Sequence, residues 1–114
     1  MPPRHWRARV EDILDAIARI QRYTEGMDSG AFAKDQKTID AVVRNLEIIG
    51  EVSRHIPDDV QNRYATLPWS EMRSMRNLLS HAYFLVDVGI LWKTVREDLD
   101  PIAPSLRQIL GENP

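Results

Sequence analysis

The sequence predicts an all-α fold, an up-and-down bundle of four to five helices. Apolar residues recur at spacings of three and four over most of the chain. No segment shows the polar-apolar alternation of a strand, and short links containing glycine, proline and aspartate separate the periodic segments. The length of 114 residues suits one domain over 1–114, and we expect flexible ends at 1–7 and 111–114.

The first helix is expected at about residues 8–25. Its apolar positions keep helical spacing; they are Val10, Ile13, Leu14, Ile17 and Ile20. The segment 25–36 follows, and its Gly26, Asp28, Ser29 and Gly30 predict a turn that ends this helix.

The second helix is expected at about 36–55 and stops before Pro57. Its apolar positions are Ile39, Val42, Val43, Leu46, Ile49 and Ile56. Gly50 lies inside it, although glycine costs about 1 kcal/mol relative to alanine in a helix, which indicates close approach by another helix. Asp58 and Asp59 can then cap a short helical turn over 58–65.

The third helix should start after Pro68, with Ser70 as its N-cap, and should continue through Met72 and Met75 toward Leu79. The last apolar series has a spacing near 3.5; it comprises Val88, Leu91, Trp92, Val95, Leu99, Ile102, Leu106, Ile109 and Leu110. Because Pro101 and Pro104 interrupt this series, we expect a helix over 87–99, a kink, and a frayed continuation to Leu110.

Composition excludes several classes of function. The chain has no cysteine, so disulfides, thiolate metal sites and cysteine nucleophiles are ruled out. A formal net charge of −2 lacks the basic excess of a duplex DNA binder, so any nucleic-acid contact must be local. The charged N-terminal segment does not resemble a signal peptide, and no apolar run could span a membrane, which predicts a soluble cytoplasmic protein.

Familiar catalytic and metal motifs are also missing. No GxSxG, GxGxxG, GxxxxGK[ST] or HExxH pattern occurs, so His5, Asp28 and Ser29 resemble parts of a triad only on paper. Glu47, Glu51 and His55 form an i, i+4 ladder on the second helix, but the Glu-x-x-His pattern of di-metal bundles is absent. We therefore interpret the ladder as a polar stripe and expect neither a metal nor a cofactor.

Residues 76–84, RNLLSHAYF, gather an arginine, an asparagine, a serine, a histidine and a tyrosine in the most apolar half of the chain. Arg76 and His81 suit metal-independent RNA cleavage, in which a base takes the 2′-hydroxyl proton and a cation stabilises the charged phosphate. Asn77 could hydrogen-bond to either the phosphate or the imidazole. On one continuous helix, Arg76 and His81 would point about 140° apart. The site therefore needs a helix end near Ser80, or two copies of the motif facing each other in a symmetric dimer.

The sequence alone does not decide whether the protein is a monomer or a dimer. The apolar faces look wide for a lone bundle, and the chain has 3 tryptophans and 4 methionines. These residues would suit dimerisation through helical faces, but they could equally fill the core of a monomer.

The whole pattern resembles the HepT-like family of the HEPN superfamily, small helical proteins found beside minimal nucleotidyltransferases in prokaryotic toxin–antitoxin pairs. The resemblance rests on EDILDAIARIQRYTEG at 11–26, DAVVRNLEIIGE at 40–51, PWSEMRSMRN at 68–77 and LWKTVREDL at 91–99. It also rests on the family signature of arginine, four residues, histidine, any residue and tyrosine, which Arg76, His81 and Tyr83 satisfy, with Asn77 in the polar position after the arginine.

What the resemblance implies is a HEPN-like homodimer whose two motifs line one cleft and act as a metal-independent endoribonuclease toxin. It also implies an antitoxin partner, a minimal nucleotidyltransferase that silences the nuclease by attaching AMP to Tyr83. Such a phosphodiester would add charge and bulk where RNA phosphate must sit.

Two other readings remain open. The chain could be a non-catalytic helical module that binds a nucleotidyltransferase or nucleic acid, with the polar cluster forming a buried dimer network. It could also be a structural bundle in which the cluster merely caps the third helix.

Overall fold

The computed structural model of the chain describes residues 5–80 and 87–111. For residues 77–80 it describes the backbone but not the side chains. Every regular element within these ranges is helical, which confirms the all-α prediction. In chain order the elements are α1 (Trp6–Tyr23), α2 (Ser29–Ala33), α3 (Gln36–Ser53), α4 (Asp58–Arg63), α5 (Trp69–Ser80), α6 (Val88–Lys93), the π-helical turn η1 (Thr94–Asp98) and α7 (Leu99–Gly111).

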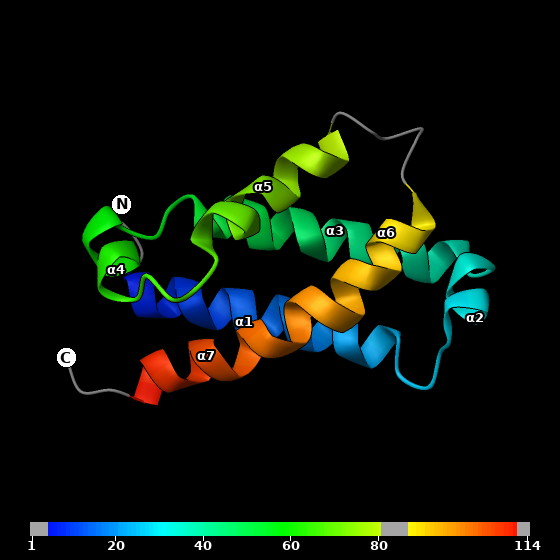
Figure 1. Ribbon diagram of the computed structural model, residues 1–114, viewed down its shortest axis with the longest axis horizontal. Helices are drawn as coiled ribbons and strands as arrows, with labels where there is room; N and C mark the ends of the chain where they lie inside the picture. The colour runs from blue at the N-terminus through cyan, green and yellow to red at the C-terminus, as the bar shows by residue number, and fades with distance from the viewer. Residues whose placement is uncertain (1–4, 81–86, 112–114) are drawn as a thin grey trace.

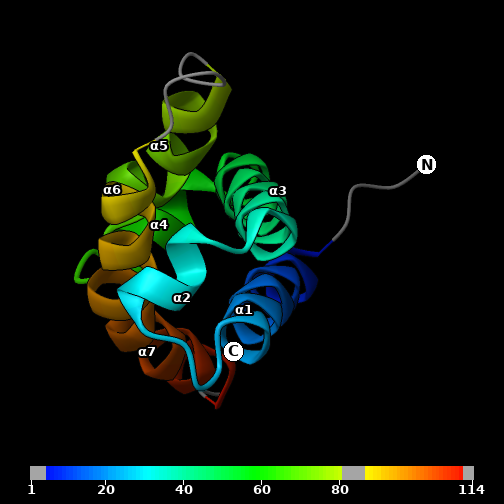
Figure 2. The same ribbon diagram turned by 90° about the vertical axis from the view of Figure 1, so that its right-hand side faces the viewer.

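The long helices run in alternating directions around one elongated core, as an up-and-down bundle requires (Figure 1). α3 packs against both α1 and α5, and α7 packs against α1. Seen along the long axis, α5 lies on the far side of α3 from α1, and its C-terminal end stands away from the bundle (Figure 2). At the opposite end of the molecule, Nη1 of Arg7 donates a hydrogen bond to the carbonyl of Leu110 at 3.1 Å. None of the described helices is long and apolar enough to cross a bilayer.

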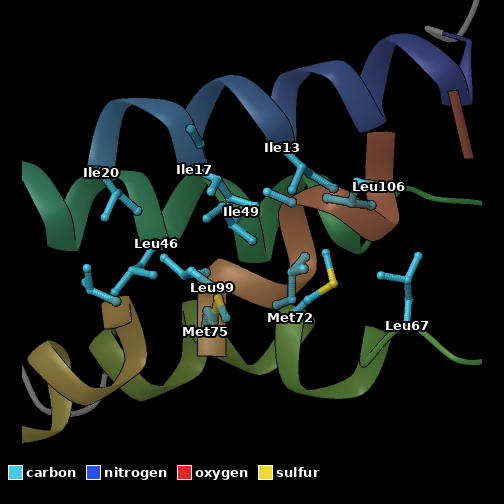
Figure 3. Close-up of a cluster of buried hydrophobic side chains, with 14 of the residues drawn as sticks. Ile13, Ile17, Ile20, Leu46, Ile49, Leu67, Met72, Met75, Leu99 and Leu106 are labelled. Carbon is cyan, nitrogen blue, oxygen red and sulfur yellow. The ribbon is translucent and has the colours of Figure 1, made fainter. Parts of the chain in front are cut away.

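The core consists of the apolar stripes that the sequence pattern predicts. Side chains from α1, α3, α5 and α7 converge in its centre (Figure 3). The labelled buried residues of these helices are Ile13, Ile17, Ile20, Leu46, Ile49, Met72, Met75, Leu99 and Leu106. Because burying one such side chain contributes about 1.5–3 kcal/mol, this shared core supplies the main stabilisation of the bundle.

A buried polar side chain fixes the pairing of α1 with α3. Asn45 is 5% exposed, and its Oδ1 accepts a hydrogen bond from Nε of Arg19 at 2.8 Å. Its amide nitrogen donates to the carbonyl of Ala41 at 2.9 Å. Since a buried polar group without a partner is costly, this arrangement favours one register between the two helices.

The predicted boundaries of the first two long helices and of the short turn after Pro57 are confirmed to within two residues. Segment 25–36 is a different case, because the structure contains α2 where the sequence predicts only a turn. Asp28 caps this short helix through the amide of Ala31. Phe32 is fully buried and its ring centroid lies 5.1 Å from that of Trp92 on α6, so tertiary packing stabilises a helix too short for periodicity to reveal.

The third predicted helix exists, but its predicted cap is wrong. α5 begins at Trp69, and the amide of Met72 bonds to the carbonyl of Pro68. Ser70 therefore lies inside the first turn, where its carbonyl accepts a hydrogen bond from Oγ of Ser74. Trp69 is 5% exposed, and its burial helps to explain why the helix starts two residues earlier than a cap at Ser70 would place it.

The frayed continuation predicted after residue 99 is also wrong, because a regular helix occupies this segment. α6, η1 and α7 follow one another without a gap, and the amide of Leu99 bonds to the carbonyl of Thr94, five residues earlier. We attribute the wider turn to Pro101, since a proline ring lacks an N–H and crowds the carbonyl four residues before it. α7 then passes through Pro104 and continues to Gly111, because Ile102, Leu106 and Ile109 are buried in the core.

Candidate active site

The sequence motif that starts at Arg76 begins in the second half of α5. Trp69, Met72 and Met75 repeat every three residues and are buried against the core, which turns the next residue, Arg76, toward the surface. Its side chain is 47% exposed. Of the other predicted site residues, Asn77 lies in α5 by its backbone, its side chain being outside the described residues, and His81 and Tyr83 lie outside the described residues altogether.

Arg76 lies at a close contact between α5 and Gly50 of α3. A Cβ atom added to Gly50 would lie 2.5 Å from the backbone nitrogen of Arg76, 2.8 Å from its Cβ and 3.1 Å from its Cα. Only glycine allows this approach, so the sequence interpretation of Gly50 as a point of close helix contact is confirmed. The backbone of the motif arginine is thus fixed against α3.

The residue after Gly50 meets the arginine side chain. Oε2 of Glu51 lies 3.2 Å from Nη1 of Arg76, and the Glu51 side chain is 48% exposed. The same carboxylate contacts two further donors in the turn that directly follows α3, Nη1 of Arg54 and Nε2 of His55, each at 3.4 Å. One carboxylate therefore links two guanidinium groups and an imidazole on the surface shared by α3 and α5.

Electrostatics around Glu51 favour its charged form. Partial desolvation by neighbouring atoms acts to raise the pKa of Glu51, but the hydrogen bond with His55 and the positive charges of Arg76 and Arg54 outweigh it and leave the pKa below its ordinary value. At neutral pH the carboxylate is ionised. The pair with Arg76 is therefore an ion pair between full charges.

The ladder on α3 behaves as a polar stripe in its described contacts. Glu47 pairs with Arg44 at 3.7 Å, one turn before Glu51. In the described ranges, no group of three or more His, Asp or Glu side chains is arranged to hold a metal ion.

His5 and Asp28, which resemble parts of a triad in the sequence, are helix N-caps in the structure. Nδ1 of His5 accepts a hydrogen bond from the amide of Arg7 at the start of α1. Asp28 accepts one from the amide of Ala31 at the start of α2. Satisfying the open amides of a helix N-terminus is the ordinary role of such side chains.

A groove of about 600 Å³ lies between α5 and the η1–α7 segment, on another face of α5. Its described lining contains the carboxylates Glu71, Glu97 and Asp98 and no lysine or arginine. Since carboxylates repel phosphate, this groove is poorly suited to RNA. The surface around Arg76 and Arg54, where two guanidinium groups surround one carboxylate, is the better candidate for a phosphate site.

Sequence reasoning missed the partnership of Glu51 and Arg54 with the motif arginine. It identified Glu51 only as a member of a ladder along one helix. The available signal was Gly50, because a glycine that marks a helix crossing places its neighbour beside the other helix. The sequence does not say which helix crosses there.

The chain is similar to a family of known proteins over most of its length. A model of the HepT-like family, described as "Ribonuclease HepT-like", matches residues 13–109. A "Probable ribonuclease HepT" of Thermococcus cleftensis is 49% identical over 98 residues, which cover 86% of each chain. A "Putative RNase" of Methanocaldococcus jannaschii is 39% identical over 102 residues, or 90% of this chain and 94% of the relative. No solved structure matches the chain significantly.

Proposed function

Because the chain belongs to the HepT-like family, we propose that it is a metal-independent endoribonuclease whose site contains Arg76, Asn77 and His81. The observation that supports the proposal best is Arg76 itself, a half-exposed guanidinium on a backbone held against α3. The relatives that are named as ribonucleases support the same reaction class. The substrate is RNA.

The proposed reaction is transfer of the phosphate to the neighbouring ribose hydroxyl. The 2′-oxygen attacks phosphorus, the bond from phosphorus to the 5′-oxygen breaks, and the products are a cyclic phosphate and a free 5′-hydroxyl. His81 removes the 2′-hydroxyl proton or protonates the leaving oxygen. Arg76 stabilises the negative charge that builds on the phosphate oxygens, and Asn77 orients the phosphate or the imidazole.

A homodimer fits this chemistry because one imidazole cannot serve both proton transfers at once. Two copies related by a twofold axis would supply one base and one acid to a shared cleft. The outward position of the C-terminal end of α5 (Figure 2) leaves it accessible to a second copy. A monomer at high concentration in sedimentation experiments would contradict this part of the proposal.

We further propose that the protein is the cytoplasmic toxin of a toxin–antitoxin pair and that a minimal nucleotidyltransferase neutralises it by attaching AMP to Tyr83. A phosphodiester there would occupy Arg76 in place of substrate. The test is the variant Tyr83→Phe, which should still cleave RNA but should neither accept labelled AMP nor be silenced by the partner. Labelling of the variant to the same extent as the wild type would refute Tyr83 as the acceptor.

The central test measures RNA cleavage in excess chelator. Arg76→Ala and His81→Ala should each lose activity by about 10²-fold or more, as expected for removal of a group that acts in the transition state. The matched control is Arg107→Ala, which removes an exposed arginine from α7 and should cleave at the wild-type rate. If the wild type is inactive on all RNAs tested, the chain is a binding module and not a nuclease. If the two site variants keep full activity, the assignment of Arg76 and His81 to the site is refuted.

A further inference from the structure

We propose that Glu51 is a positioning residue of the nuclease site, holding the guanidinium of Arg76 in the orientation that receives the substrate phosphate. The proposal rests on the ribonuclease function proposed above. It adds to that function a residue outside the motif, contributed by a different helix.

The ion pair gives the exposed end of Arg76 a fixed point. An arginine side chain has many rotamers, and ordering it costs conformational entropy. With 47% of the Arg76 side chain exposed, packing alone constrains it only in part. The contact of 3.2 Å between its Nη1 and Oε2 of Glu51 selects one direction among those that solvent would allow.

The helix crossing makes this contact reproducible. The backbone of Arg76 lies against Gly50, and Glu51 is the next residue on α3. Successive helical residues are rotated by about 100°, so Gly50 faces α5 while the carboxylate of Glu51 reaches around its side. Backbone packing therefore brings the two residues within reach of each other, and the ion pair then selects the side-chain conformation.

Glu51 is itself held by two neighbours just beyond the C-terminal end of its helix. Arg54 is the C-cap of α3 and His55 follows it in the turn, and both contact the same carboxylate. The lowered pKa of Glu51 agrees with this surrounding of donors. A carboxylate constrained from two sides can orient a third group more firmly than a free one can.

Two alternatives fit the observations less well. Exposed ion pairs contribute little to folding stability, so stability alone is a weak reason for this arrangement. In the second alternative, Glu51 would neutralise the site and so compete with the RNA phosphate for Arg76. The two positive charges of Arg54 and Arg76 exceed the one negative charge of Glu51, so the cluster keeps a positive charge for phosphate. A guanidinium also carries donors on two edges, so contact of one Nη with Glu51 leaves geometry for a phosphate on another edge.

The experiment compares Glu51→Gln with Glu47→Gln. Both replacements keep the shape of the side chain and remove one charge from α3, but Glu47 pairs with Arg44 and not with the motif arginine. For Glu51→Gln we expect kcat for RNA cleavage to fall by about tenfold with KM changed by less than about threefold, since misplacing a catalytic group mainly affects the transition state. Glu47→Gln should cleave like the wild type, and both variants should melt within a few degrees of it.

A second readout follows Arg76 without relying on cleavage. The Nε–Hε signal of Arg76 in ¹⁵N spectra can be identified by its loss in Arg76→Lys. It should move and exchange faster with water in Glu51→Gln, and it should be unchanged in Glu47→Gln. This signal reports whether the ion pair between Glu51 and Arg76 exists in solution, and the fall of kcat at nearly constant KM then distinguishes positioning from a merely structural role.

The outcomes separate this inference from the function on which it rests. If Arg76→Ala and His81→Ala are inactive while Glu51→Gln cleaves at the wild-type rate, or faster, the positioning role is refuted and the nuclease stands. Equal losses for both glutamine variants, or an unmoved Arg76 signal, also refute it. Full activity of Arg76→Ala and His81→Ala refutes the proposed nuclease site, and the positioning role of Glu51 with it, whereas an inactive wild type refutes the nuclease function itself.

Discussion

Replacing Gly50 by alanine tests the central geometric feature of the site, the close crossing of α3 and α5. Alanine is the better helix former by about 1 kcal/mol, so helix propensity alone predicts that the variant is more stable. Packing predicts the opposite. The new methyl group would lie 2.5 Å from the backbone nitrogen of Arg76, whereas ordinary contacts begin at 3.4 Å.

The size of the effect follows from what must move. The obstructing atoms include backbone atoms of α5, so a change of rotamer cannot relieve the contact. The two helices must move apart by nearly 1 Å to bring the distance from the new Cβ to the nitrogen of Arg76 from 2.5 Å to about 3.4 Å. Overpacking of this kind costs about 1–3 kcal/mol, and here we expect its upper range. After subtraction of the gain in propensity, we expect a net loss of about 1–2 kcal/mol, or a fall in Tm of about 4–8 °C.

The assay is thermal unfolding followed by circular dichroism, with Gly111→Ala and Gly30→Ala as controls. A Cβ at Gly111 would meet nothing within 4 Å, and one at Gly30 would make an ordinary contact of 3.5 Å with Asp28, so both controls should be neutral or slightly stabilised. RNA cleavage by Gly50→Ala should also fall, because α5 carries Arg76 away from Glu51. An unchanged or raised Tm for Gly50→Ala would refute the close crossing.

Two further predictions concern stability. Asn45→Ala should destabilise the fold by about 1–3 kcal/mol, since it removes both hydrogen bonds of a buried amide and leaves Nε of Arg19 without its acceptor; chemical denaturation should show this loss and no comparable one for the exposed Asn62→Ala. Asp35 caps α3, and its hydrogen bonds with the amide and hydroxyl of Thr38 lower its pKa. Because the pKa of Asp35 is lower in the folded state, its contribution is present above the unfolded value of about 3.9 and is lost as pH falls through the folded value. Tm measured between pH 5 and pH 2 should therefore fall less steeply for Asp35→Asn than for the wild type, and parallel curves would contradict the prediction.

The helices of this protein were largely predictable because their information is local. The period of the apolar residues in 10–20 and 39–49 predicts both the helices and the buried faces that pair α1 with α3. Pro57 predicts the end of one helix for an equally local reason, since proline restricts the residue before it. The motif around Arg76 was visible in the same way, as a spacing of residue types.

Only the tertiary structure decided how these local elements modify one another. α2 exists because Phe32 is buried against Trp92, a contact between segments that the sequence does not place together. The prolines of the last segment became part of α7 because burial of its apolar face outweighs the interruption that they cause.

The partner of Arg76 is the clearest case. The sequence determined that a guanidinium stands at this point of α5 and that Gly50 permits a close approach by some helix. Which helix approaches, and by what rotation, depends on the packing of the whole core, and that packing places Glu51 at 3.2 Å from Arg76. A periodic pattern specifies the buried face of a helix, but the neighbours of an exposed side chain are set by the crossing of two helices, which no single segment encodes.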